Sequence, residues 1–249
     1  MRALFPPLRE RAVDAVEEMD RSDADPRRLE HTYAQFRLIN AVVSGWRRNY
    51  EKYLLPIFRE SGGGTLLDIG SGGGDVPRSI ARWARRDGLA LEIAAVDPDP
   101  RAHAFASALP PLPGLAFRRA FSSELVAEGR SYDVVISNHM LHHLTPAELH
   151  ALLSDSERLA RRMCLHSDIE RSRWAYALFS IGTLPFFPGS FIRADGLTSI
   201  RRSFTAAELA AVTPDGWEGR QHRPWQNLLI HPPLGPVPGT SASAVFHAG

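Results

Sequence analysis

The spacing of apolar residues changes near residue 65. Before that point, apolar side chains recur every three or four positions in three segments, which are Leu8–Met19, a longer stretch that begins near Pro26, and Tyr50–Phe58. This period is typical of helices that cover an apolar surface with one face. Residues 1–60 are therefore expected to form an N-terminal helical cap, joined to the rest of the chain by the glycine-rich residues 61–64.

From Thr65 onward, short apolar runs alternate with amphipathic segments, a pattern that predicts an α/β fold with a mostly parallel sheet and helices on both faces. The expected strands are Thr65–Ile69, Leu91–Val96, Leu115–Arg119, Tyr132–Ser137, Arg162–His166, Glu218–Arg223 and Gln226–Ile230. The expected helices are Val76–Arg86, Pro100–Ala108, Pro146–Ala160 and one capped by Thr205, with Glu208 three residues later. Residues 61–230 are expected to form one domain.

One apolar segment interrupts this alternation after the fifth strand. Trp174–Ile192 holds 19 consecutive residues without a charge, which is long enough to suggest a membrane span. Because Gly182, Pro185 and Pro188 break a helix, a lid over a pocket is the better interpretation, and we place it at 174–203. Residues 231–249 form a tail rich in Pro, Gly and Ser, for which disorder is expected.

Composition narrows the class of protein. A net charge of +1 with 44% hydrophobic residues excludes a disordered chain and argues against a nucleic-acid partner. The single cysteine, Cys164, excludes an internal disulfide and a cysteine-rich zinc site, so the cytoplasm is the expected compartment. No integral membrane segment is expected, and a homodimer stays open.

A glycine-rich turn follows the first predicted strand. Gly70, Gly72 and Gly74 allow a sharp turn and the close approach of a ligand, next to the free amides of a helix N-terminus. The dinucleotide fingerprint requires a glycine where Asp75 stands. Together with Asp68 at the end of the strand, this favours a ligand that carries an amino group over a diphosphate.

Two further strand ends carry polar side chains. Asp97, followed by Pro98, ends the second strand, where a carboxylate can accept both hydroxyls of a ribose. The fourth strand ends in a polar cluster beside the same crevice. Its members are Asn138, His139, His142 and His143.

These motifs together resemble class I S-adenosylmethionine-dependent methyltransferases, of the kind found in ubiquinone and menaquinone biosynthesis. The resemblance covers about Thr65 to Ile230 and implies a Rossmann-like, seven-stranded sheet. It also implies S-adenosyl-L-methionine as cofactor, with S-adenosyl-L-homocysteine as product. The segments Phe36–Asn40, His166–Ser172 and Ile192–Thr205 are similar to bacterial methyltransferases of polyketide and aromatic secondary metabolism.

The resemblance also implies roles for single residues. The three glycines of the turn wrap the methionine part, Asp68 faces its amino group, Asp97 binds the ribose, and Asn138 lies near the methionine end. Where the family often has an acid for the adenine amino group, this chain has Phe121, so adenine is left with backbone groups, Ser122 or stacking on Phe121. Arg37 and Asn40, three residues apart on one helix face, reach the cofactor carboxylate or form a solvated face.

A phenolic acceptor needs a base near the methyl donor, and a histidine near neutrality fits this role. His142 is the first candidate, followed by His139 and His143. No metal site is expected, because the adjacent His142 and His143 cannot easily face one ion. The expected substrate contacts are Trp174, Phe179, Phe186, Phe187 and Arg193.

The sequence thus predicts a methyltransferase for a small aromatic substrate of phenolic or quinol type, with O-methylation in secondary metabolism as the first interpretation. C-methylation of the same kind of ring is the alternative within this class. A nicotinamide-dependent oxidoreductase and a non-catalytic cofactor-binding protein are the alternatives from other classes.

Overall fold

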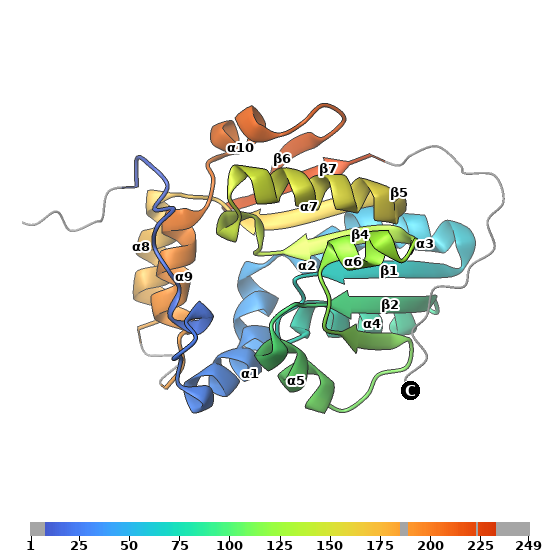
Figure 1. Ribbon diagram of the computed structural model, residues 1–249, viewed down its shortest axis with the longest axis horizontal. Helices are drawn as coiled ribbons and strands as arrows, with labels where there is room; N and C mark the ends of the chain where they lie inside the picture. The colour runs from blue at the N-terminus through green and yellow to red at the C-terminus, as the bar shows by residue number, and fades with distance from the viewer. Residues whose placement is uncertain (1–7, 185–188, 223, 233–249) are drawn as a thin grey trace, which may run out of the picture.

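The computed structural model describes residues 8–184, 189–222 and 224–232, and its centre is a seven-stranded sheet in the order β3-β2-β1-β4-β5-β7-β6 (Figure 1). The strands are β1 (Gly63–Ile69), β2 (Ala90–Val96), β3 (Leu115–Arg118), β4 (Tyr132–Asn138), β5 (Ala160–Ile169), β6 (Glu218–His222) and β7 (Gln226–His231). Neighbouring strands from β3 to β5 are parallel, whereas β7 is antiparallel to both β5 and β6. The predicted seven-stranded, mostly parallel α/β fold is confirmed.

The direction of the strand order reverses between β1 and β4, which lie side by side in the middle of the sheet. In open α/β sheets, the loops on either side of such a reversal diverge and leave a crevice at the carboxyl ends of the strands. The glycine turn after β1 and the polar cluster after β4 therefore face each other across this crevice.

Helices cover both faces of the sheet. They are α1 (Pro26–Val43), α2 (Trp46–Asn49), α3 (Leu55–Ser61), α4 (Asp75–Arg86), α5 (Pro100–Ala108), α6 (Ser122–Ala127), α7 (Pro146–Leu159), α8 (Arg173–Gly182), α9 (Ile192–Arg202) and α10 (Ala206–Val212), with a π-helical turn at Tyr50–Leu54 and 3-10 turns at Glu18–Asp20 and Leu141–His143. Buried side chains of α2, α3 and α4 pack on one face, and those of α6, α7 and α10 pack on the other. The neighbouring residues Leu66 and Leu67 of β1 point to opposite faces of the sheet. Leu66 packs in the core formed with α2, α3 and α4, and Leu67 packs in the core formed with α6, α7 and α10.

Most predicted elements lie within two residues of their expected bounds. For the helices, capping residues that can be recognised in the sequence explain where they begin. The Asp25 carboxylate accepts a hydrogen bond from the backbone N–H of Arg28, and Pro26 occupies the first turn of α1. Thr205 and Glu208 form the predicted capping box at the start of α10. The short helix α6 and the two helices α8 and α9 of the lid region had not been predicted.

The predicted helix at Leu8–Met19 is wrong, since the structure has only the 3-10 turn at its end. The apolar residues Val13 and Val16 are exposed, while Glu17 is buried. Backbone N–H groups of this segment bond to other parts of the chain, including Ala12 to the carbonyl oxygen of Arg201 at 3.0 Å. These distant acceptors replace the local hydrogen bonds of a helix.

Residues 8–25, called the N-terminal segment below, run past α8 and α9 at the edge where the parallel strands end (Figure 1). Its turn is fixed by the buried carboxylate of Asp195 on α9, which accepts hydrogen bonds from the N–H groups of Glu18 at 2.7 Å and Met19 at 3.0 Å. The region predicted as a lid contains the two helices α8 and α9. Between them lie residues 185–188, among them Phe186 and Phe187, which the structure does not describe.

None of the described helices is long and apolar enough to cross a membrane. The expected Pro/Gly/Ser-rich tail lies outside the described residues from position 233 onward.

Replacing Asp195 with Ala should release the N-terminal segment. The change leaves the N–H groups of Glu18 and Met19 without their acceptor, which removes a net contribution of about 0.5–1.5 kcal/mol for each hydrogen bond. We expect the melting temperature to fall by several degrees and trypsin to cleave after Arg21 at least about tenfold faster. Exposed Asp14→Ala is the matched control, and equal cleavage of both variants would contradict this role of Asp195.

Candidate functional site

Two cavities meet at the carboxyl edge of β1, β2 and β4. The first has a volume of ≈ 190 Å³ and includes Asp68, Gly72 and Asn138 in its lining, and the second has ≈ 470 Å³ and includes Asp97 and Phe121. Both are lined by a common set of residues, which are Asp20, Gly70, His139 and His143. The two cavities therefore form one elongated depression across the reversal point of the sheet.

The glycine turn is held against the end of β2 by its backbone. The N–H groups of Gly70 and Ser71 donate to the carbonyl oxygen of Val96, and the N–H of Gly72 donates to the Asp97 carboxylate at 2.8 Å. Gly70, Gly72 and Gly74 all have positive φ, between 52° and 78°. A Cβ on Gly74, the N-cap of α4, would lie 2.6 Å from the Phe117 ring, so this glycine shapes the turn without lining either cavity.

Asp68 is the most unusual group of the site. It is 1% exposed, it lines the first cavity, and neither carboxylate oxygen has a hydrogen-bond partner among the described residues. Burial, together with the charges of Asp75 and Asp97, raises its pKa well above the usual value. A buried carboxylate without a partner is costly, so this position is suited to a ligand that brings a cation or a hydrogen-bond donor.

Asp97 and its neighbours line the second cavity, as the ribose assignment requires. The Asp97 carboxylate is oriented by the N–H groups of Gly72 and Asp99. Burial raises its pKa, and these two hydrogen bonds oppose that effect. The other predicted cofactor residues at this end, Pro98, Phe121 and Ser122, also line this cavity.

The second cavity includes an acid that the sequence analysis does not single out. Asp155 of α7 lines the second cavity and accepts a hydrogen bond from the Ser122 hydroxyl at 2.7 Å. The side chain of Phe121 is 60% exposed, which leaves its ring available for stacking. Asp155 lies on the helix after β4, far in sequence from the strand where the acid was expected.

The lining of the first cavity includes two amide side chains. The side-chain oxygen of Asn138 is buried and has no partner among the described residues. Asn40 lines the same cavity but donates to the Asp75 carboxylate at 2.9 Å, so it joins α1 to α4. The side chain of Arg37 lies outside the described part of the structure.

His142 is fully buried between two carboxylates from distant segments. Its Nδ1 lies 2.8 Å from Asp168, and its Nε2 lies 3.3 Å from Glu17. Burial lowers the pKa of this histidine, but the two acids outweigh burial and raise it to about 9. Glu17 shows the converse effect, because its histidine partners overcome burial and lower its pKa to about 2. Both ring nitrogens of the first-choice base are therefore engaged.

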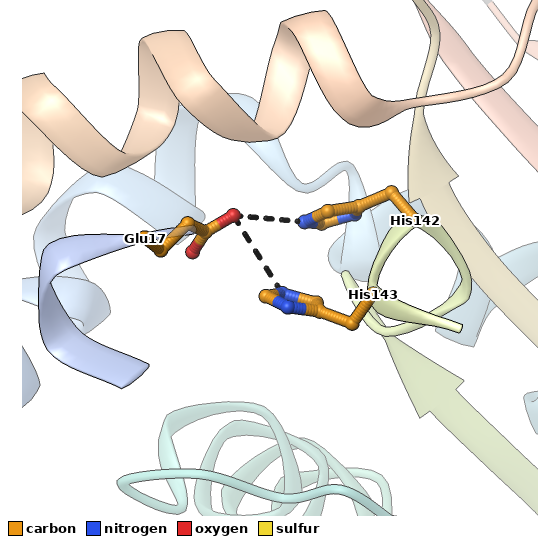
Figure 2. A group of neighbouring side chains, drawn as sticks. All are labelled: Glu17, His142 and His143. Atoms are coloured by element: carbon orange, nitrogen blue, oxygen red, sulfur yellow. Dashed lines mark hydrogen bonds and ion pairs between the residues drawn. The ribbon is translucent and has the colours of Figure 1, made fainter. Parts of the chain in front are cut away.

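His143 approaches the same oxygen of Glu17, with its Nε2 at 3.7 Å (Figure 2). Its Nδ1 lies 3.3 Å from Asp20, and its ring lies against that of His142 with 4.2 Å between centroids. The premise that these adjacent histidines cannot face one point is wrong, because the 3-10 turn at Leu141–His143 lets both Nε2 atoms converge on Glu17.

His139 differs from His142 in charge, and its backbone conformation is unusual. It is half-buried and has φ of 52°, a left-handed conformation that is uncommon outside glycine. Burial lowers its pKa to about 4 despite the nearby charge of Asp168, so the ring is neutral at pH 7. A neutral ring keeps one nitrogen as a hydrogen-bond acceptor.

A third cavity of ≈ 500 Å³ adjoins the first and has a mainly apolar lining. Ile39, His139, Ile169 and Phe179 line both cavities, so Phe179 lies where the sequence predicted an acceptor wall. Among the described residues, Trp174 and Arg193 line none of the three cavities. Trp174 is 72% exposed, and the Arg193 guanidinium contacts Ser180 on α8.

A family model described as a methyltransferase domain matches residues 8–212. The chain belongs to this methyltransferase family. The match covers the glycine turn, Asp97 and the histidine cluster, so the predicted class I S-adenosylmethionine-dependent methyltransferase is confirmed. S-adenosylmethionine is the methyl donor of this class, and the unpartnered Asp68 carboxylate fits its amino group.

Solved structures of methyltransferases share the fold at low sequence identity. Human N-acetylserotonin methyltransferase with S-adenosylmethionine has a TM-score of 0.52 at 13% identity, covering 80% of this chain and 53% of its own. The plantazolicin methyltransferase BpumL with a pentazolic desmethylplantazolicin analogue and S-adenosylhomocysteine has a TM-score of 0.50 at 12% identity, with 82% and 95% covered. Magnesium protoporphyrin IX methyltransferase from Synechocystis PCC 6803 has a TM-score of 0.49 at 14% identity, with 84% and 98% covered. No curated protein sequence matches the chain.

Asp68→Asn should weaken cofactor binding without lowering the stability of the protein. The amide preserves the shape of the side chain but removes the charge that faces the cofactor amino group, so we expect the affinity for S-adenosylhomocysteine to fall at least about tenfold. The melting temperature of the cofactor-free protein should stay the same or rise, because a buried carboxyl group without a partner is removed. Calorimetric titration and thermal unfolding of both proteins measure this, with exposed Asp215→Asn as control. Unchanged affinity would contradict the role of Asp68.

His142→Ala should be strongly destabilising. It leaves Glu17 and Asp168 buried without the cation between them, a loss of about 3–5 kcal/mol for a broken buried pair. At about 2–4 °C per kcal/mol, the melting temperature should fall by roughly 6–20 °C. If thermal unfolding of the variant resembled that of the native protein, the ion-pair role of His142 would be refuted.

Proposed function

We propose that this methyltransferase transfers a methyl group to a hydroxyl group on a small aromatic metabolite of phenolic or quinol type. One observation carries this proposal, namely that His139 lines all three cavities at once. The cofactor depression and the apolar cavity thus meet at a neutral imidazole. An acceptor ring in the apolar cavity would place its hydroxyl group beside His139.

S-adenosylmethionine supplies a methyl group that is activated by a sulfonium charge, so the protein has mainly to bind, orient and exclude water. Asp68 binds the amino group of the cofactor, and Asp97 binds the ribose. Asn138, with its unpartnered oxygen, lies between the glycine turn and the acceptor side and orients the methionine end.

His139 accepts a hydrogen bond from the acceptor hydroxyl and takes its proton as the oxygen becomes an ether. The low pKa keeps the ring unprotonated before the reaction, so one ring nitrogen is free to accept the hydrogen bond, and the hydroxyl becomes acidic enough to give up its proton only as the methyl group bonds to its oxygen. His142 and His143 remain members of the polar wall, but their nitrogens already face carboxylates. Of the three histidines that the sequence singled out, His139 is therefore the one that we assign to the acceptor.

The substrate class follows from the third cavity. Its volume of ≈ 500 Å³ accommodates a fused or substituted aromatic ring, and Leu38, Leu178 and Phe179 make most of its described wall apolar. The described residues that line it include one acid, Asp168, which is paired with His142. A neutral, flat acceptor suits this lining better than a charged one.

The proposal also includes a cellular location and an oligomeric state, both expected from the sequence. The cytoplasmic location is supported by Cys164, which is buried and free. A homodimer through α8 is supported by the exposed apolar side chains of Trp174, Leu178 and Ile181.

Incubation with isotopically labelled cofactor and a panel of phenols, quinols and their methyl ethers, followed by mass spectrometry, tests the proposed function. A labelled methyl group on oxygen supports the proposal, and one on a ring carbon supports C-methylation of the same ring. Consumption of none of these acceptors by a protein that binds the cofactor would overturn the proposed substrate class.

Substitutions at His139 should lower turnover without weakening cofactor binding. His139→Gly and His139→Asn both tolerate the left-handed backbone, so neither adds the strain of an alanine at φ of 52°. We expect kcat to fall by roughly 10²–10⁴-fold in His139→Gly, with His139→Asn between it and the native enzyme. Affinity for S-adenosylhomocysteine should change by less than about threefold. Native turnover in both variants would exclude His139 as the proton acceptor.

A further inference from the structure

The cluster of Glu17, His142 and His143 has a geometry that ordinary ion pairing does not require. The two histidines come from the 3-10 turn after β4, and Glu17 comes from the N-terminal segment, 125 residues away in sequence from His142. Figure 2 shows both imidazole rings directed at one carboxylate oxygen. One ligand atom from each residue can be chosen so that all three lie within 4.8 Å of one another.

A second carboxylate lies next to the other ring nitrogen, Nδ1, of each histidine. Asp168 lies 2.8 Å from Nδ1 of His142, and Asp20 lies 3.3 Å from Nδ1 of His143. A proton on each Nδ1 leaves the lone pair of each Nε2 directed at the same point. Histidines that bind metals show this pattern, with the outer nitrogen donating to a carboxylate that fixes the ring.

The distances also suit a small divalent ion. An ion with tetrahedral bonds of about 2.0–2.1 Å holds its ligand atoms about 3.3 Å apart. The Glu17 oxygen lies 3.3 Å from Nε2 of His142 and 3.7 Å from Nε2 of His143. The third distance, between the ligand nitrogens of the two histidines, is within 4.8 Å, so an ion can be placed among the three atoms once the two rings move closer to each other.

We propose that Glu17, His142 and His143 form a binding site for a divalent transition-metal ion. Two imidazole nitrogens and one carboxylate oxygen are a donor set for Zn²⁺ and for its spectroscopic substitute Co²⁺, and the set is too rich in nitrogen for Mg²⁺ or Ca²⁺. The ion replaces the proton that His142 shares with Glu17. It also ties the N-terminal segment to the loop after β4.

Three protein ligands leave a fourth position of the ion free for water or a ligand oxygen. All three residues line the first cavity, together with Asp68 and Gly70, so this position opens toward the cofactor depression. The site rests on the geometry of the cluster alone and would stand even if the proposed acceptor class failed.

The test uses full-length protein without a polyhistidine tag, stripped with a chelator and titrated with Co²⁺. We expect one ion per chain, visible ligand-field absorption of a site with nitrogen and oxygen ligands, and displacement of Co²⁺ by Zn²⁺. Glu17→Gln and His143→Ala should each weaken Co²⁺ binding at least about 100-fold, and Asp20→Asn about 10–100-fold, since it only supports His143. His150→Ala, which removes an exposed histidine, should leave the affinity unchanged.

Two results would overturn the proposal. One is the absence of stoichiometric Co²⁺ or Zn²⁺ binding by the native protein, which would leave the cluster as a plain network of ion pairs. The other is binding that Glu17→Gln and His143→Ala leave intact while both variants still bind S-adenosylhomocysteine. If a variant fails to fold, X-ray absorption of the native protein loaded with Zn²⁺ decides instead, because it must show two imidazole ligands and no sulfur. None of these measurements involves methyl transfer, so they fail independently of the proposed function.

Discussion

The buried imidazole of His142, held between Glu17 and Asp168, connects the parts of the molecule that make the site. A buried carboxylate is costly unless a counter-charge or a hydrogen-bond donor reaches it, and here one ring satisfies two of them from opposite sides. Glu17 belongs to the N-terminal segment, His142 follows β4, and Asp168 lies near the end of β5. His142 therefore acts together with Asp195 on α9 to hold the N-terminal segment at the carboxyl edge of the sheet. The position of the wall of the first cavity depends on these contacts.

The strand ends of the site could be predicted because their signals are local. A run such as Leu66–Ile69 followed by glycines predicts both a strand and the turn after it. The carboxyl ends of parallel strands meet at one edge of the sheet, so the residues that follow them are expected to lie together. Asp68, Asp97 and Asn138 are predicted in this way, and each lines a cavity of the structure. Asp168 has the same signal, an acid near the end of a strand, but its role is visible only once His142 is known to face it.

The rest could not be predicted because it depends on contacts between distant residues. The segment Leu8–Met19 has a helical pattern of apolar residues, yet its backbone bonds to Arg201 and Asp195 across the fold. Helices α8 and α9 were not predicted because the glycines and prolines of this stretch suggested irregular structure, yet Gly182 is the last residue of α8 and α9 accommodates Gly196. Asp155 lines the second cavity from a helix, so no strand-end rule could identify it.

The three histidines after β4 show how environment, rather than residue type, assigns a chemical role. His139, His142 and His143 lie within five positions of one another, and a sequence gives each the same ordinary pKa. In the fold, desolvation dominates at His139 and leaves it neutral, whereas two carboxylates overcome desolvation at His142 and keep it charged. A neutral ring can accept a proton from a substrate, and a charged ring held on both sides cannot. The proposed catalysis by His139 and the anchoring by His142 are therefore compatible within one short loop, because the carboxylates of Glu17 and Asp168 balance the charge of His142.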